Sequence, residues 1–299
     1  MTHVATLVCH PDRPVLTADL IAEAGAALSA VTATTVLNPA VAVDLSFAPL
    51  GSADNRAIAD AVRARLGSSP VDVVVQRADT RRKALFLADM DSTMIGQECI
   101  DELADMVGMK EHVAAITERA MRGEIEFEPA LRERVALLKG LPAGVVDEVI
   151  KSRITLTSGG RALVATMRAN GAYTALVSGG FTLFTARVGA MIGFDENRAN
   201  ILEVADDRFA GLVREPILGR EAKRETLIAL RAARRLAPMA TLAVGDGAND
   251  LAMLGEAGLG VAYRAKPKVA EAADARIDHA DLTALIYAQG YSISDFVAH

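Results

Sequence analysis

The feature that most constrains this chain is a short apolar run, residues 84–88, that ends in two carboxylates. Asp89 and Asp91 follow the run directly, and Ser92 and Thr93 follow them. A wholly apolar run of this length is typical of a strand buried on both faces of a parallel sheet. Ligands bind outside the carboxyl ends of such strands, so the acids lie where chemistry is expected. A strand followed by an ordinary Asp-Ser turn is the alternative for this stretch alone.

The spacing of Asp89 and Asp91 favours a bound cation. Two carboxylates this close repel each other unless a cation or a shared proton lies between them. Their oxygens suit a hard ion such as Mg²⁺, which keeps several waters and often bridges to a phosphate. The first hypothesis is therefore a metal-assisted site for phosphoryl transfer.

A second apolar run, residues 173–177, ends in Ser178, Gly179 and Gly180. Glycines at a strand end let the backbone approach an anion closely, and the amides of a following helix point at it. Further along, Lys223 lies in the first turn of a predicted basic helix over residues 220–236. A plain turn and a surface lysine are the alternatives for these two features.

A third apolar run, residues 240–244, leads into Asp246, Asn249 and Asp250. Two carboxylates and an amide that bracket small residues at a strand end are what a hard-metal site needs. The segment lacks the remaining ligands of a twelve-residue calcium loop. Weaker runs at 258–262 and 275–277 are predicted to complete a doubly wound, mainly parallel α/β sheet.

The chain before this sheet predicts a smaller α+β unit over residues 1–80. Its pattern reads strand, helix, strand, strand, helix, strand, the order of a ferredoxin-like unit. The expected strands are 4–9, 31–37, 41–47 and 71–75, and the expected helices are 16–28 and 56–66. No catalytic residue types cluster there, so we interpret the unit as regulatory or dimerising. Residues 78–83 are predicted to form a basic linker into the second unit, 81–299.

Residues 95–153 show helical periodicity and predict a cap inserted over the strand ends. The expected helices are 98–107, 110–122, 129–139 and 143–151, divided at glycines. Caps of this kind exclude water and contact the substrate. Glu98 and Arg134 have the charges to hold a zwitterion, and Met121 and Phe127 the surface for an apolar wall. Spacing does not select Arg134 over its charged neighbours, and structural roles remain the alternative for each of these residues.

Bulk composition narrows the function classes. The chain has 299 residues and a net charge of -6, which gives no reason to expect nucleic acid or an anionic membrane as partner. Cys9 and Cys99 are too few for a disulfide framework and suit a reducing compartment. No apolar run has the length of a membrane span. We therefore expect a soluble cytoplasmic protein.

Taken together, the motifs resemble those of the haloacid dehalogenase-like (HAD) phosphohydrolases, and most closely their phosphoserine phosphatase branch. The resemblance covers about residues 84–286. D-M-D-S-T at 89–93, V-S-G-G-F at 177–181, Lys223 and G-D-G-A-N-D at 245–250 match the family's four ordered motifs. The resemblance implies a HAD-like core with a helical cap, and the first segment looks like a divergent ACT-like domain.

The resemblance also implies roles. Asp89 would be the nucleophile and Asp91 the general acid and base. Mg²⁺ would bind Asp89, the Asp91 carbonyl and Asp246, with Asp250 supporting it from behind. The phosphoryl oxygens would contact a second group of residues: Ser178, Gly179, Gly180, Lys223 and Asn249. Glu98 and Arg134 would hold the ammonium and carboxylate of L-phosphoserine beside Met121 and Phe127.

The implied reaction is Mg²⁺-dependent hydrolysis of L-phosphoserine to L-serine and phosphate, the last step of serine biosynthesis. The first segment is compatible with a homodimer.

Three alternatives stay open. The chain could act on another small phosphate ester or transfer the phosphoryl group to an acceptor. It could be an amino-acid sensor with an inactive core, although that would leave Asp89, Asp91, Lys223 and Asp246 without a purpose. A plain metal-binding protein would leave Ser178 and Lys223 unexplained.

Overall fold

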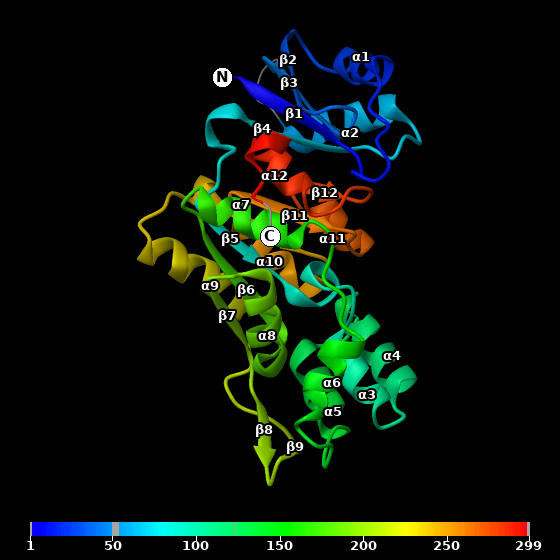
Figure 1. The fold of residues 1–299 in the computed structure, drawn as a ribbon, viewed down its shortest axis with the longest axis vertical. Coiled ribbons are helices and arrows are strands. Elements are labelled where there is room, and N and C mark those ends of the chain that lie inside the picture. Colours follow the sequence, from blue (N-terminus) through cyan, green and yellow to red (C-terminus); the bar gives the residue numbers. More distant parts are fainter. Residues whose placement is uncertain (1, 50–53, 123, 298–299) are drawn as a thin grey trace.

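The fold has three parts, which follow one another along the long axis of Figure 1. The computed structural model of the chain describes residues 2–49, 54–122 and 124–297, apart from the side chain of Met121. An antiparallel N-terminal unit lies at one end, a parallel sheet with its helices lies in the middle, and a helical cap lies beside a hairpin at the other end.

The N-terminal unit has the predicted order of strands and helices. It consists of β1 (His3–Val8), α1 (Ala18–Ala26), β2 (Val31–Asn38), β3 (Ala42–Phe47), α2 (Asn55–Leu66) and β4 (Asp72–Arg77). The strands form an antiparallel sheet in the order β2-β3-β1-β4, which is the ferredoxin-like arrangement. The side chain of Asp54 caps α2, and Gly67 ends it with a φ of 61°, a value that glycine adopts without strain.

The central sheet is parallel and positions the strand ends that carry the motifs. Its strands run in the order β12-β11-β10-β5-β6-β7. Their bounds are β5 (Leu85–Ala88), β6 (Tyr173–Phe181), β7 (Glu196–Asn200), β10 (Thr241–Gly245), β11 (Leu259–Tyr263) and β12 (Ala275–Ile277). The chain leaves β5 toward β6 and β7 and later returns on its other side through β10. The end of β5 therefore lies at the point where the strand order reverses, the usual binding site of such a sheet.

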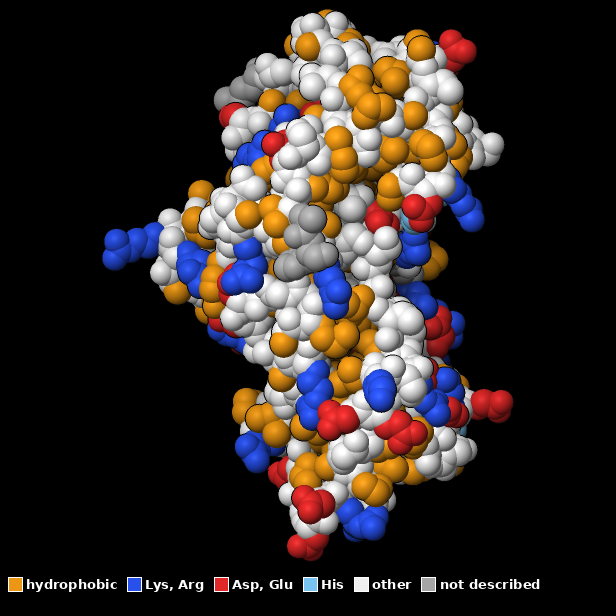
Figure 2. All heavy atoms as spheres, in the orientation of Figure 1, with side chains coloured by type: hydrophobic (Ala, Val, Ile, Leu, Met, Phe, Trp, Pro, Cys, Tyr) orange, Lys and Arg blue, Asp and Glu red, His pale blue; other side chains and the backbone are white. Residues whose placement is uncertain are grey.

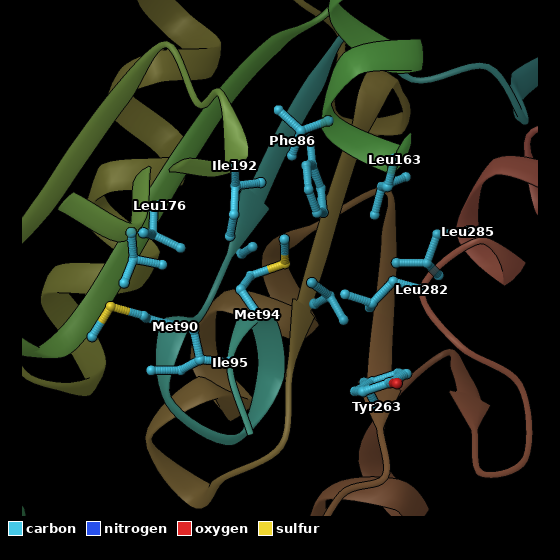
Figure 3. Close-up of a cluster of buried hydrophobic side chains, with 14 of the residues drawn as sticks. Phe86, Met90, Met94, Ile95, Leu163, Leu176, Ile192, Tyr263, Leu282 and Leu285 are labelled. Carbon is cyan, nitrogen blue, oxygen red and sulfur yellow. The ribbon is translucent and has the colours of Figure 1, made fainter. Parts of the chain in front are cut away.

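Helices cover both faces of this sheet, as in a doubly wound fold. One face packs against α7 (Gly160–Ala169), α8 (Thr182–Ile192) and α12 (Ala284–Ala288), and the other against α9 (Arg220–Ala233), α10 (Leu251–Glu256) and α11 (Pro267–Ala272). Figure 3 shows Phe86 of β5 on the first face, with Leu163, Ile192 and Leu285 around it. Helix α11 begins at Pro267, where proline fits a first turn.

The cap consists of α3 (Cys99–Asp105), α4 (Lys110–Met121), α5 (Phe127–Ala136) and α6 (Val145–Ser152). Its two connections to the core pair at the Ile95–Leu156 bridge. A hairpin of β8 (Leu202–Ala205) and β9 (Arg208–Val213) turns at Asp206-Asp207 and lies beside the cap (Figure 1). The Gly140 amide donates to the Phe209 carbonyl at 2.8 Å, so the hairpin holds one edge of the cap.

Residues 78–83, the predicted basic linker, connect β4 to β5 and take part in the contact between the N-terminal unit and the core. Arg81 pairs with the buried Asp44 at 2.5 Å, and Lys83 is itself buried. The Asp72 carboxylate accepts hydrogen bonds from the backbone amides of Asp278, His279 and Ala280. Arg81 and Asp72 thus have partners across this contact, whereas Lys83 donates to the Met239 carbonyl within the core.

The surface is mixed in character. Figure 2 shows Lys and Arg side chains interspersed with Asp and Glu on the face in view. Among the helices in the described parts of the chain, none is long and apolar enough to cross a membrane.

Candidate active site

A tight turn after β5 places the first two acids. Asp91 is extended (φ -65°, ψ 138°), and Ser92 has a φ of 54°, in the left-handed region that residues other than glycine rarely adopt. Met90 and Met94 are fully buried in the core beneath the turn (Figure 3). Because these two apolar side chains anchor the turn, Asp89 and Asp91 are presented at the sheet edge.

Asp89, Lys223 and Asp250 form a buried ion cluster. Lys223 Nζ lies 2.7 Å from Asp89 Oδ1 and 2.7 Å from Asp250 Oδ1, and its side chain is fully buried. Burial alone would lower the pKa of Lys223, but the charges of Asp250 and Asp89 outweigh it and raise that pKa. Burial, followed by the charge of Asp250, raises the pKa of Asp89 well above its ordinary value. The lysine that surface preference would place in water is thus the permanent cation of the site.

Asp246 completes a group that fits a hard divalent cation. Asp89, Asp246 and Asp250 each offer an oxygen within 4.8 Å of the others. Asp250 has both oxygens engaged, one by Lys223 and one by the amides of Asp246 and Gly247. Burial and the charge of Asp250 raise the pKa of Asp246 to about 7. Three buried acids with one lysine carry excess negative charge, and oxygen donors are what Mg²⁺ prefers.

Asp91 is held apart from this cluster, by the second motif and by the start of the cap. Its Oδ2 accepts a hydrogen bond from Ser178 Oγ at 3.1 Å, and its Oδ1 accepts one from the Cys99 amide at 2.8 Å. Burial raises the pKa of the Asp91 carboxyl. The two acids of the first motif therefore occupy different environments, as their different expected roles require.

Two glycines after Ser178 lie where a side chain would not fit. A Cβ at Gly180 would lie 2.9 Å from Asp91 Oδ2, and one at Gly179 would lie 2.8 Å from Phe127 Cζ. The Gly180 amide donates to Ser178 Oγ at 2.8 Å. Strand β6 runs on through Phe181 and does not stop at residue 177 as expected, with a shift in its pairing across this stretch.

Two oppositely charged side chains face the strand ends from the cap. Glu98 Oε1 accepts a hydrogen bond from Ser92 Oγ at 2.5 Å, and burial raises the pKa of Glu98 well above its ordinary value. Arg134 is 4% exposed, whereas Arg132 is exposed and pairs with Glu215 at 2.5 Å. The structure therefore selects Arg134 from charged neighbours that the sequence could not separate.

A cavity of about 360 Å³ lies between the cap and the sheet, and its lining does not include Lys223, Asp246 or Asp250. Asp89, Asp91, Glu98, Phe127, Arg134, Ser178, Gly179, Gly180 and Asn249 all lie in its wall. Asn249 Oδ1 is buried and has no hydrogen-bond partner among the described residues. The expected apolar contact of Met121 concerns a side chain outside the described residues.

Sequence reasoning missed four polar or charged residues in the cavity wall, Thr117, Glu124, Glu126 and Arg220. Thr117 Oγ1 accepts a hydrogen bond from Arg134 Nη1 at 2.9 Å. Arg220 precedes Lys223 by three residues on α9, so helical spacing places both on one face and was the available signal for it. No comparable signal marks Thr117, because its contact with Arg134 depends on how α4 packs against α5 and not on spacing within one helix.

Comparison with known proteins shows which family this chain resembles in sequence and structure. Residues 86–255 match the haloacid dehalogenase-like hydrolase family. A phosphoserine phosphatase from Polaromonas sp. is 47% identical over 207 residues, which are 68% of this chain and 88% of the relative. A structure described as a phospho-aspartyl intermediate analogue of phosphoserine phosphatase is 40% identical, with a TM-score of 0.66, over 69% of this chain and 98% of that one. A HAD family hydrolase from Salmonella enterica serovar Typhi is 27% identical, with a TM-score of 0.83, over 97% of this chain and 98% of that one.

Proposed function

Because this chain belongs to the haloacid dehalogenase-like hydrolase family, we propose that its cavity hydrolyses L-phosphoserine to L-serine and phosphate. The observation that carries the proposal is that Asp89, which pairs with the buried Lys223, lines one cavity together with the oppositely charged Glu98 and Arg134. The first can act on a phosphoryl group, and the second matches the charges of an amino acid.

Asp89 is the proposed nucleophile. One of its oxygens attacks phosphorus, the bond from phosphorus to the serine oxygen breaks, and an aspartyl phosphate forms. Lys223, 2.7 Å from Asp89 Oδ1, stabilises the negative charge that collects on the transferring group. The Ser178 hydroxyl and the glycine backbone beyond it contact the phosphoryl oxygens, with the Asn249 amide at the same wall.

Asp91 is the proposed proton carrier. Its hydrogen bonds to Ser178 and to the Cys99 amide hold it beside the nucleophile but off the ion cluster. It donates its proton to the departing serine oxygen. It then accepts a proton from the water that attacks the aspartyl phosphate, so that phosphate leaves and both acids return to their starting states.

Mg²⁺ is the proposed cofactor, held by Asp89, the Asp91 carbonyl and Asp246, with Asp250 orienting these groups and Lys223. When bound, it offsets phosphate charge and acid repulsion and acts as a Lewis acid. Thr93 donates to Asp246 Oδ1 at 3.1 Å and thereby fixes that carboxylate.

The cap supplies the proposed amino-acid recognition. Glu98 accepts from the substrate ammonium, and Arg134 donates to its carboxylate. Phe127 closes the cavity against Gly179 and so limits the entry of water.

The decisive experiment measures phosphate release from L-phosphoserine with Mg²⁺ and after EDTA. We expect turnover that EDTA abolishes and added Mg²⁺ restores. Phosphothreonine and sugar phosphates in the same assay test for another ester, and added alcohol acceptors test for phosphotransfer. Binding of L-serine without Mg²⁺-dependent turnover would instead support an amino-acid sensor.

We also propose that residues 1–80 form a regulatory or dimerising unit, and that the enzyme works as a cytoplasmic homodimer in serine biosynthesis. Residues 31–36 of the edge strand β2 are exposed and uncharged, and Val31 and Val36 are 40% and 56% exposed. Natural edge strands usually carry charges that prevent pairing, so this one suits a second copy. Thr34→Lys should shift a dimer to monomer in sedimentation, whereas a wild-type monomer would contradict the proposal.

The proposed cytoplasmic location rests on the cysteines. Cys9 and Cys99 are free and buried, which suits a reducing compartment.

A further inference from the structure

The carboxylate of Glu98 is held by a hydroxyl from the strand-end turn. Glu98 is the N-cap residue of α3, yet its side chain accepts no hydrogen bond from that helix. It accepts instead from Ser92 Oγ at 2.5 Å. Ser92 makes this contact with a left-handed backbone, a conformation that is unfavourable for a non-glycine residue. The turn therefore keeps an unfavourable conformation that points the hydroxyl at Glu98.

Arg134 is held by a second hydroxyl, in a chain that joins three cap helices. Arg134 Nη1, on α5, donates to Thr117 Oγ1, on α4, at 2.9 Å. Thr117 Oγ1 donates in turn to Asp101 Oδ1, on α3, at 2.7 Å. Arg134 Nε donates to the Ala130 carbonyl at 3.0 Å. These contacts use two of the five guanidinium N–H groups and leave three for a ligand.

Both sets of hydrogen bonds, Ser92 to Glu98 and Asp101 through Thr117 to Arg134, end on groups that line the cavity. Glu98, Thr117 and Arg134 all lie in its wall, and Thr117 is 3% exposed. A flexible side chain that is fixed before binding loses less conformational freedom when the ligand arrives. A purely structural role for the two hydroxyls would affect the whole cavity alike, whereas positioning affects one substrate group at a time.

We propose that Ser92 and Thr117 are positioning residues that set substrate selectivity, Ser92 by fixing Glu98 for an ammonium group and Thr117 by fixing Arg134 for a carboxylate. The inference rests on the proposed phosphoserine phosphatase activity and deepens it. Asp101 belongs to the second chain because it orients the Thr117 hydroxyl, whose proton would otherwise go to the Val113 carbonyl at 3.0 Å.

Three phosphate esters distinguish the effect of the Ser92–Glu98 contact from that of the Thr117–Arg134 contact. L-Phosphoserine has both groups, 3-phosphoglycerate has a hydroxyl in place of the ammonium, and phosphoethanolamine lacks the carboxylate. We would measure kcat/KM for each with Mg²⁺, or an inhibition constant for an analogue that is not hydrolysed. The readout is the ratio of the value for L-phosphoserine to that for each analogue, which cancels any common loss of activity.

Thr117→Val keeps the shape of the side chain and removes its hydroxyl. It should lower the ratio of L-phosphoserine over phosphoethanolamine about tenfold and leave the ratio over 3-phosphoglycerate within about twofold. Ser92→Ala should lower the ratio of L-phosphoserine over 3-phosphoglycerate and leave the ratio over phosphoethanolamine unchanged. Ser92→Gly, which accepts the left-handed backbone, should give the same result. In an Arg134→Ala background, Thr117→Val should cause no further change in either ratio, since it acts through Arg134.

The matched control is Thr166→Val on α7, which removes a buried hydroxyl that accepts from the Val297 amide away from the cavity. It should move neither ratio. Proportional losses on all three esters, or no change in either ratio, would overturn the positioning role. Failure of the wild-type protein to hydrolyse L-phosphoserine would overturn the proposed function as well, so the two failures are distinguishable.

Discussion

Phe127 lies where a side chain at Gly179 would have to be. A Cβ at Gly179 would lie 2.8 Å from Phe127 Cζ, and one at Gly219 would lie 3.5 Å from Phe127 Cδ1. Phe127 belongs to the cap and both glycines belong to the core. This contact therefore sets how closely the cap approaches the part of β6 that follows Ser178.

The first prediction concerns this contact. Gly179→Ala should lower kcat/KM for L-phosphoserine at least about tenfold, because the new methyl group forces the ring and the cap away from the strand ends. Phe127→Leu should recover part of that loss in the double variant, since it removes the atoms that collide. Gly255→Ala is the control, because a Cβ there meets nothing within 4 Å. Unchanged kcat/KM in Gly179→Ala would show that the contact does not limit closure.

The second prediction concerns the nucleophile. Asp89→Asn should lower kcat by a factor of about 10⁴ or more, since an amide oxygen cannot form the aspartyl phosphate. Circular dichroism should show an unchanged fold. Asp206→Asn, at the exposed hairpin turn, removes the same charge far from the cavity and should keep full activity. Appreciable turnover by Asp89→Asn would exclude the covalent mechanism.

The third prediction concerns metal binding and needs no substrate. Mg²⁺ that binds only the folded protein raises the unfolding temperature. At a free Mg²⁺ concentration one hundred times the dissociation constant, binding adds about 2.7 kcal/mol to the free energy of unfolding. We expect this rise in the wild-type protein and its near loss in Asp246→Asn, which removes one anionic ligand. Asp206→Asn should respond like wild type. An equal response in Asp246→Asn would place the ion elsewhere.

The strand ends were predictable because each combines two local signals. An apolar run of five residues marks a buried strand, and polar residues at its end mark the ligand edge, so Asp89, Ser178 and Asp246 could be placed from the sequence. The order of the sheet then brings them together. Strand β7 was missed because Glu196–Asn200 is polar and lies at the sheet edge, where burial does not demand an apolar pattern.

The choice among cap side chains was not predictable, because it depends on packing between helices. Arg132 and Arg134 have the same chemistry and lie two residues apart, yet one faces solvent and the other is buried beside Thr117. The register of α5 decides between them, and that helix begins at Phe127, two residues before the expected start. Lys83 was misplaced for the same reason, because its burial depends on tertiary contacts, among them its hydrogen bond to the Met239 carbonyl.

The last prediction concerns that lysine and the pH dependence of stability. Lys83 is 6% exposed and donates to the Met239 carbonyl at 2.9 Å. Burial, offset in part by the charge of Asp274, lowers the pKa of Lys83 from 10.5 to about 8. Between these values the unfolded chain binds more protons than the folded one, so this lysine makes the free energy of unfolding rise with pH. Below pH 8 both states are charged, and the full cost of burying the cation is present.

Lys83→Met removes that cost. The variant should be more stable than wild type at pH 7, on the order of 1–3 kcal/mol, and the difference should shrink as the pH rises from 8 toward 10. Urea unfolding of both proteins at pH 7 and pH 9.5 measures it, and other titrating groups cancel in the difference. Lys268→Met, at an exposed position on α11, should show no such trend. A stability difference that stays constant across this range would mean that Lys83 keeps its charge at high pH, held by Asp274 and the Met239 carbonyl.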